Sequence, residues 1–177
     1  MNKNLISLSI FLIFFFASVN TEASDYKITL GSGVAQSSIK IIKIGVQKDF
    51  TYQWLEKFKT RHGFLSGYFE ATYNYFTHNT NDIHAVSVSP VFIYCFNSNA
   101  NSFIPYIEGG IGALFMDNYN IANKDLSMSF QFEDRVGIGI KTKKLDWNIR
   151  YLHYSNASIK EPNDGMDILM LTMTISF

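Results

Sequence analysis

The chain has 177 residues, of which 47% are hydrophobic and 16% aromatic, and its 15 basic residues balance 15 acidic ones. That length suffices for one domain or one small barrel. A nucleic-acid-binding protein would carry a basic excess, so the balanced charge argues against that class. The single cysteine, Cys95, excludes an internal disulfide.

Residues 1–23 have the features of a secretory signal peptide. Lys3 gives a positive start, residues 5–17 form an apolar run, and small residues at Thr21 and Ala23 fit a cleavage site. The apolar run is too short to span a bilayer as a helix. We therefore expect residues 1–23 to be removed and residues 24–177 to fold as one domain.

The rest of the chain alternates between apolar and polar residues, which is the period of β-strands. Weaker runs accompany the clear ones and bring the total to about eight, an even number that suits a closed membrane barrel. Helical periodicity is absent. The clear runs cover 65–75, 86–94, 103–113, 130–141, 145–151 and 169–177, and the weaker ones 25–34 and 39–50.

The positions of the charged residues favour a membrane barrel over a soluble one. In an outer-membrane barrel the apolar face points to lipid and the lumen is polar. Mid-strand charges fall on the polar face, where they can pair inside a narrow lumen: Glu70, Glu108, Glu133, Arg135 and Arg150. The chain also ends on Phe177 within an alternating strand, which resembles the C-terminal signal of outer-membrane barrels. We predict an all-β fold, an eight-stranded antiparallel transmembrane β-barrel located in a bacterial outer membrane.

Three residues at one end of the last hairpin could perform chemistry together. His153 and Ser155 continue the outward stripe of the strand at 143–156, and Asp167 begins the outward stripe of the strand at 166–177. Directly opposed residues on neighbouring strands have Cβ atoms about 4.5–5.5 Å apart. Asp167 would therefore lie opposite either Ser155 or His153, with the connecting loop outside the cell.

This arrangement suits a Ser-His-Asp triad, in which Ser155 attacks an ester, His153 takes its proton and Asp167 orients the imidazole. Asn156 or nearby backbone N–H groups could stabilise the oxyanion. A lipid-facing site at the level of the outer leaflet would act on the ester-linked acyl chains of lipopolysaccharide. The residues alone thus suggest a serine esterase for a lipid substrate.

The segment from His153 to Asp167, HYSNASIKEPNDGMD, resembles the signature of the PagL family, the outer-membrane lipid A 3-O-deacylases. The segments at 65–70, 90–94, 105–112 and 132–137 are also similar to family segments. The resemblance implies hydrolysis of the 3-position ester of lipid A with release of a 3-hydroxy fatty acid, without metal or other cofactor. It also implies that His153 and Ser155 are catalytic, with Asn156 and Asn163 on the oxyanion side.

The chain departs from the family pattern at two positions. Asp167 stands where glutamate is usual, so its carboxylate is one methylene shorter, and Ser158 stands where glycine is usual. Both departures bear on the catalytic rate, because the first shortens the reach to His153 and the second affects a backbone N–H.

Three other functions remain open on the sequence. They are a non-enzymatic small barrel for adhesion or anchoring, a lipid acyltransferase that passes the chain to an acceptor other than water, and a soluble lipocalin-like carrier. The expected partners are lipid A or lipopolysaccharide and the outer membrane, with no nucleic acid. Oligomeric state, including a homodimer, and acyl-chain preference are left open.

Overall fold

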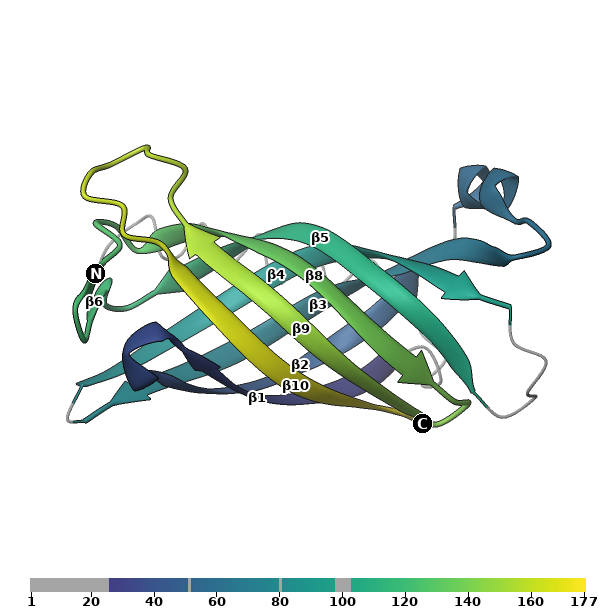
Figure 1. The fold of residues 1–177 in the computed structure, drawn as a ribbon, viewed down its shortest axis with the longest axis horizontal. Helices are drawn as coiled ribbons and strands as arrows, with labels where there is room; N and C mark the ends of the chain where they lie inside the picture. Colours follow the sequence, from purple (N-terminus) through teal and green to yellow (C-terminus); the bar gives the residue numbers. More distant parts are fainter. Residues whose placement is uncertain (1–25, 51, 80, 98–102) are drawn as a thin grey trace, which may run out of the picture.

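The computed structural model describes residues 26–50, 52–79, 81–97 and 103–177. The expected signal peptide, residues 1–23, lies outside the described residues. Among the described residues, eight long strands form one closed antiparallel barrel in the order β1-β10-β9-β8-β5-β4-β3-β2 (Figure 1). These strands are β1 (Tyr26–Ala35), β2 (Lys40–Phe50), β3 (Gly63–His78), β4 (Asn81–Phe96), β5 (Ile104–Met116), β8 (Phe130–Lys141), β9 (Leu145–Ser155) and β10 (Met166–Ser176).

Short elements connect the strands at the two ends of the barrel. The β1–β2 connection holds a 3-10 turn, η2 (Gln36–Ser38), and the β2–β3 connection holds η3 (Gln53–Phe58). The β5–β8 connection forms a small hairpin from β6 (Asn120–Ile121) and β7 (Lys124–Asp125). Within the described part of the chain, no helix is long and apolar enough to cross a membrane.

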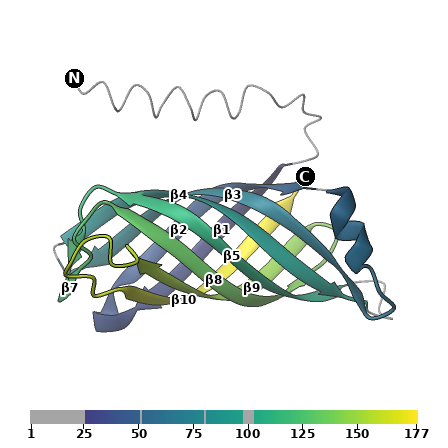
Figure 2. The same cartoon turned by 90° about the horizontal axis from the view of Figure 1, so that it is seen from above.

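Period-two alternation places apolar side chains on the outside of the wall, as expected for strands that face lipid. On β9, for example, Trp147, Ile149 and Tyr151 are all about half exposed, whereas Asn148 and Arg150 between them are buried in the lumen. β3 and β4 are the longest strands, and the strands are tilted about the barrel (Figures 1 and 2). The predicted eight-stranded barrel is confirmed.

Buried charges pair across part of the lumen. Glu70 Oε2 lies 2.7 Å from Arg135 Nη2, and Glu70 Oε1 lies 2.9 Å from Arg150 Nη1. Glu133 faces Lys43 at 3.2 Å. The charged side chains predicted for the polar face therefore pair inside the barrel. Lys43 completes this network and had not been singled out from the sequence.

The loop end of the barrel, where strands β9 and β10 are connected, has an apolar interior instead. The expectation of a polar lumen thus holds for only part of its length. The members of this apolar cluster come from the strand ends and the connections at this end of the barrel. The cluster includes Ile39, Ile41, Phe76, Ile121, Leu126, Leu152, Met166 and Ile168.

Candidate active site

His153 and Asp167 form a hydrogen-bonded pair on the outer wall at the loop end of the barrel. They are direct partners in the β9–β10 register, and His153 Nδ1 lies 2.6 Å from Asp167 Oδ1. Because a carboxylate accepts hydrogen bonds, Nδ1 carries the hydrogen and Nε2 keeps its lone pair. Both side chains are about one-third exposed, at 38% and 34%. The sequence left Asp167 opposite His153 or Ser155, and the register places it opposite His153.

Alternation along β9 explains why His153 points outward. Its neighbours Leu152 and Tyr154 are fully buried in the barrel, so the side chains at 151, 153 and 155 lie on the outer face. The Tyr151 hydroxyl is a further hydrogen-bonding neighbour of the Asp167 carboxylate. A polar cluster on this face is tolerated near the rim of a membrane barrel, where the lipid-facing penalty is small.

Ser155 is the last residue of β9 and shares the outer face with His153, two residues away. Its side chain is half-buried, and in the described part of the chain its hydroxyl has no hydrogen-bond partner. In the β8–β9 register it stands opposite Phe132, which continues an aromatic row with Phe130 and Phe115. Ser155 thus shares its face with His153 and has Phe132 beside it on β8, and among the described residues no hydrogen bond joins its hydroxyl to the imidazole.

Asn156 organises the loop that follows Ser155. Its side chain is fully buried, and Nδ2 donates to the backbone carbonyls of Leu126 at 2.9 Å and Lys160 at 2.8 Å. Its Oδ1 accepts from the Lys160 N–H at 3.3 Å. Both amide hydrogens are therefore committed to loop carbonyls, so in this geometry the side chain supports the loop.

Two left-handed residues turn the chain directly after Asn156. Ala157 and Ser158 have φ angles of 52° and 58°. Neither backbone N–H has a hydrogen-bond partner within the described residues, whereas the next one, that of Ile159, donates to the Asn156 carbonyl at 3.1 Å. A left-handed φ favours glycine, so Ser158 holds a backbone conformation that glycine would adopt more readily.

Asn163 fixes the start of the same loop. Its Oδ1 accepts the backbone N–H of Asn156 at 3.2 Å, which leaves its Nδ2 without a partner among the described residues. The loop thus presents three unpaired N–H donors close to the end of β9, namely those of Ala157, Ser158 and the Asn163 carboxamide. Anions and developing oxyanions are stabilised by such donors.

The β6–β7 hairpin braces this loop from the neighbouring side. The backbone N–H of Asp125 donates to Asp164 Oδ2 at 2.7 Å, and the Asp164 N–H donates to the Asp125 carbonyl at 3.2 Å. The Ser127 hydroxyl donates to the Pro162 carbonyl, whose proline follows a cis peptide bond. Sequence reasoning missed this brace, because two-residue strands leave no periodic signal.

Gly165 closes the site on the β10 side. Its φ is +61°, and a Cβ added to it would stand 3.0 Å from Cε1 of His153. Both the left-handed backbone and the close approach of the imidazole favour glycine here. The PNDG turn in the sequence was the signal that could have identified it.

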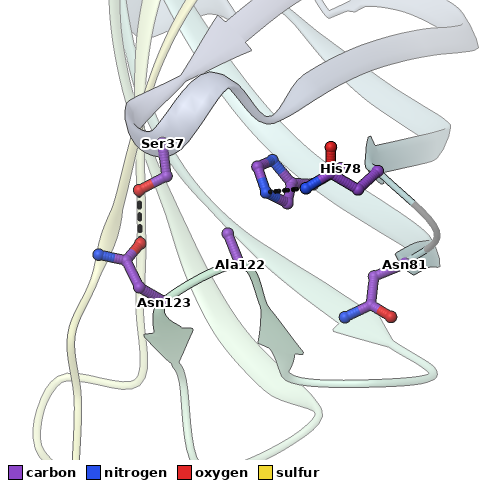
Figure 3. Close-up of a pocket in the computed structure, with 6 residues that line it drawn as sticks. Ser37, His78, Asn81, Ala122 and Asn123 are labelled. Atoms are coloured by element: carbon purple, nitrogen blue, oxygen red, sulfur yellow. Dashed lines mark hydrogen bonds between the residues drawn. The ribbon is translucent and has the colours of Figure 1, made fainter.

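A polar recess with a different set of lining residues lies among the loops. It has a volume of about 420 Å³ and is lined by Ser37, His78, Asn79, Asn81, Ala122 and Asn123 (Figure 3). The Ser37 hydroxyl donates to Asn123 Oδ1 across one edge of it. Within the described residues, no group of three or more histidine, cysteine or acidic side chains is placed to hold a metal ion.

The comparisons with known proteins show the family of the chain. The family model described as lipid A 3-O-deacylase (PagL) matches residues 41–176. The chain belongs to the PagL family. A lipid A deacylase PagL of Pseudomonas aeruginosa is 33% identical over 151 residues, which cover 84% of this chain and 83% of the relative. A PagL of Bordetella bronchiseptica is 47% identical over 73 residues, 41% of each chain.

The fold is also that of a solved PagL. The crystal structure of the outer membrane enzyme PagL superposes with a TM-score of 0.78 at 32% identity, covering 85% of this chain and 99% of that one. Membership of the PagL family confirms the resemblance found in the sequence and the location in the outer membrane. It does not favour an adhesion barrel, an acyltransferase or a soluble carrier.

Proposed function

We propose that the chain is a lipid A 3-O-deacylase that hydrolyses the ester at the 3-position of lipid A with a Ser155-His153-Asp167 triad. The observation that carries the proposal is the 2.6 Å hydrogen bond between His153 and Asp167 on the lipid-facing wall, two residues from Ser155. The family supports the reaction, since the relatives that match are named lipid A deacylases.

The first half of the reaction forms an acyl-enzyme. His153 Nε2 takes the proton of the Ser155 hydroxyl as Oγ attacks the ester carbonyl, and Asp167 stabilises the imidazolium that forms. The tetrahedral oxyanion accepts hydrogen bonds from the N–H groups of Ala157 and Ser158, with Asn163 Nδ2 as a further donor. When the intermediate collapses, His153 returns the proton to the departing sugar oxygen.

The second half releases the fatty acid. A water molecule gives its proton to His153 Nε2 and attacks the acyl carbonyl on Ser155. Collapse of this second intermediate breaks the bond to Oγ, which regains its proton from His153, and the 3-hydroxy fatty acid leaves. Both steps require an unprotonated Nε2, which is the tautomer that the Asp167 hydrogen bond favours.

The surroundings of Ser155 suit an acyl chain. Phe132 stands beside Ser155 on the outer wall, and an aromatic row leads away from it: the ring centroids of Phe132 and Phe130 are 5.0 Å apart, and those of Phe130 and Phe115 are 5.2 Å apart. Lys27, near the start of β1, pairs with Ser176 at the end of β10, so the first and last strands of the barrel begin and end at the opposite end from this site, and we assign the loop end to the outside of the cell. The site therefore lies where the ester-linked chains of the outer leaflet begin. All proposed catalytic residues come from one chain, so the mechanism needs no homodimer.

The proposal is tested on purified protein in detergent with lipopolysaccharide as the substrate. We expect wild type to release 3-hydroxy fatty acid, and His153→Ala and Ser155→Ala to release none above background. A serine-directed fluorophosphonate should label the wild type on the peptide that contains Ser155. Fatty-acid release by Ser155→Ala at the wild-type rate would refute the assigned nucleophile.

A further inference from the structure

Gln36, the first residue of η2, holds the oxygen of Asp167 that faces away from His153. Its Nε2 donates to Asp167 Oδ2 at 2.5 Å, and its Oε1 accepts the backbone N–H of Asp167 at 3.0 Å. The Gln36 side-chain amide therefore binds both the side chain and the backbone of Asp167. Gln36 lies in the β1–β2 connection, more than a hundred positions before Asp167 in the chain.

The barrel register explains why a residue so distant in sequence meets Asp167. Ala35 pairs with Ile168 where β1 and β10 meet, so the next position along, Gln36, comes level with Asp167. At this point β1 ends and the chain turns into η2, with Ser37 at a φ of 60°. The Gln36 side chain takes over a hydrogen bond to the Asp167 backbone that a continued strand would otherwise supply.

A hydrogen bond that holds Asp167 Oδ2 also restricts the position of Oδ1, because both oxygens belong to one planar carboxylate. The terminal torsion of an aspartate side chain has a broad, shallow preference, so a carboxylate held at one oxygen can still rotate. Asp167 is about one-third exposed, and water competes for its free oxygens. With Oδ1 on His153, Oδ2 on Gln36 and the Tyr151 hydroxyl as a further partner, the carboxylate plane is fixed from both sides.

We propose that Gln36 is a positioning residue that orients Asp167 for its contact with His153. The inference rests on the triad proposed above and extends it to the β1–β2 connection. Gln36 touches no reacting atom and acts through Asp167.

A double-mutant cycle between Gln36 and Asp167 tests this role. In detergent with lipopolysaccharide, we expect Gln36→Ala to lower kcat on the order of tenfold, with KM unchanged, because a misoriented group costs rate rather than substrate binding. In an Asp167→Ala background, Gln36→Ala should cause no further loss, since the two residues act as a unit. An equal loss in both backgrounds, or no loss in wild type, would overturn the proposal.

Two further variants separate orientation from loop anchoring. Asn123→Ala removes the other side-chain contact of the η2 segment, that of Ser37, without touching Asp167, and should leave kcat unchanged. Gln36→Glu keeps an acceptor for the Asp167 N–H but replaces the donor to Oδ2 with a like charge, and should lower kcat at least as much as Gln36→Ala. A loss in Asn123→Ala equal to that in Gln36→Ala would overturn the orientation role.

The same set distinguishes failure of the inference from failure of the triad. If Asp167→Ala lowers kcat and Gln36→Ala does not, the inference alone is wrong. If Asp167→Ala has wild-type kcat, the triad and the inference are both wrong.

Discussion

Asp167 stands directly opposite His153 in the barrel wall, and its Oδ1 lies 2.6 Å from the imidazole Nδ1. His153 has a second acidic neighbour, because Asp134 is its partner on the other side, in the β8–β9 register. Asp134 is half-buried on the outer face and has no hydrogen bond within the described residues. Substitution of each carboxylate in turn therefore tests which of the two orients the imidazole of His153.

We predict that Asp167→Asn lowers kcat by a factor on the order of 10²–10⁴, because an amide at this position no longer selects the tautomer with a basic Nε2. Asp134→Asn removes a partly exposed charge with no hydrogen bond, so its effect should stay within about fivefold, or about 1 kcal/mol. Steady-state kinetics on both purified variants provide the measurement. A larger loss in Asp134→Asn than in Asp167→Asn would reassign the orienting carboxylate.

Gly165→Ala should impair catalysis while the barrel still folds. A left-handed alanine costs about 1–2 kcal/mol locally, and its Cβ would stand 3.0 Å from His153 Cε1 and displace the ring. We expect kcat to fall on the order of tenfold. Gly109→Ala is the matched control, since its Cβ would meet only the Arg135 carbonyl, at 3.8 Å. An unchanged kcat in Gly165→Ala would show that this contact does not position the imidazole.

Position 158 should tolerate glycine and reject a β-branched residue. Ser158 has a φ of 58°, which glycine adopts freely and which valine essentially does not. We predict that Ser158→Gly retains full activity and that Ser158→Val loses most of it, because the N–H donors of the turn are displaced. Release of fatty acid by the two variants decides this. Equal activity in both would mean that the turn conformation does not matter to the reaction.

The buried ionic network should contribute strongly to stability. Glu70→Gln leaves Lys43, Arg135 and Arg150 with too little negative charge in a closed lumen, and we expect a cost of about 3–5 kcal/mol. Asp49→Asn breaks the exposed pair with Lys27, 2.7 Å apart, and should cost at most about 1 kcal/mol. Urea unfolding in lipid vesicles, followed by tryptophan fluorescence, compares them. Similar losses in the two variants would contradict a stabilising role for the network.

Much of the fold could be predicted from the sequence because strands carry a local signal. Alternation along 145–151 and 169–177 is visible in the residues themselves, and it places His153 and Asp167 on the same face without any structure. The register then brings the two together, as one of the two predicted pairings. The sequence predicted a polar lumen with mid-strand charges, and it did not reveal that the loop end is filled by apolar side chains such as Ile39 and Leu126.

The parts of the site that the sequence did not reveal depend on contacts between distant segments. Gln36 meets Asp167 only because closing the barrel places β1 beside β10. The sequence places the expected oxyanion side at the β9–β10 loop, and that placement stays a prediction. The commitment of both Asn156 amide hydrogens to loop carbonyls depends on where Leu126 and Lys160 lie. The roles of Asn156 and Asn163 remain predictions.

The most direct test of the account is mass spectrometry of lipid A from Gram-negative cells that express this chain, beside cells that express Ser155→Ala. We predict loss of one 3-hydroxyacyl group from lipid A with the wild type and intact lipid A with the variant. Loss of the same acyl group with both proteins would contradict the account. So would intact lipid A with the wild type, if that protein is folded in the outer membrane and is also inactive on lipopolysaccharide in detergent.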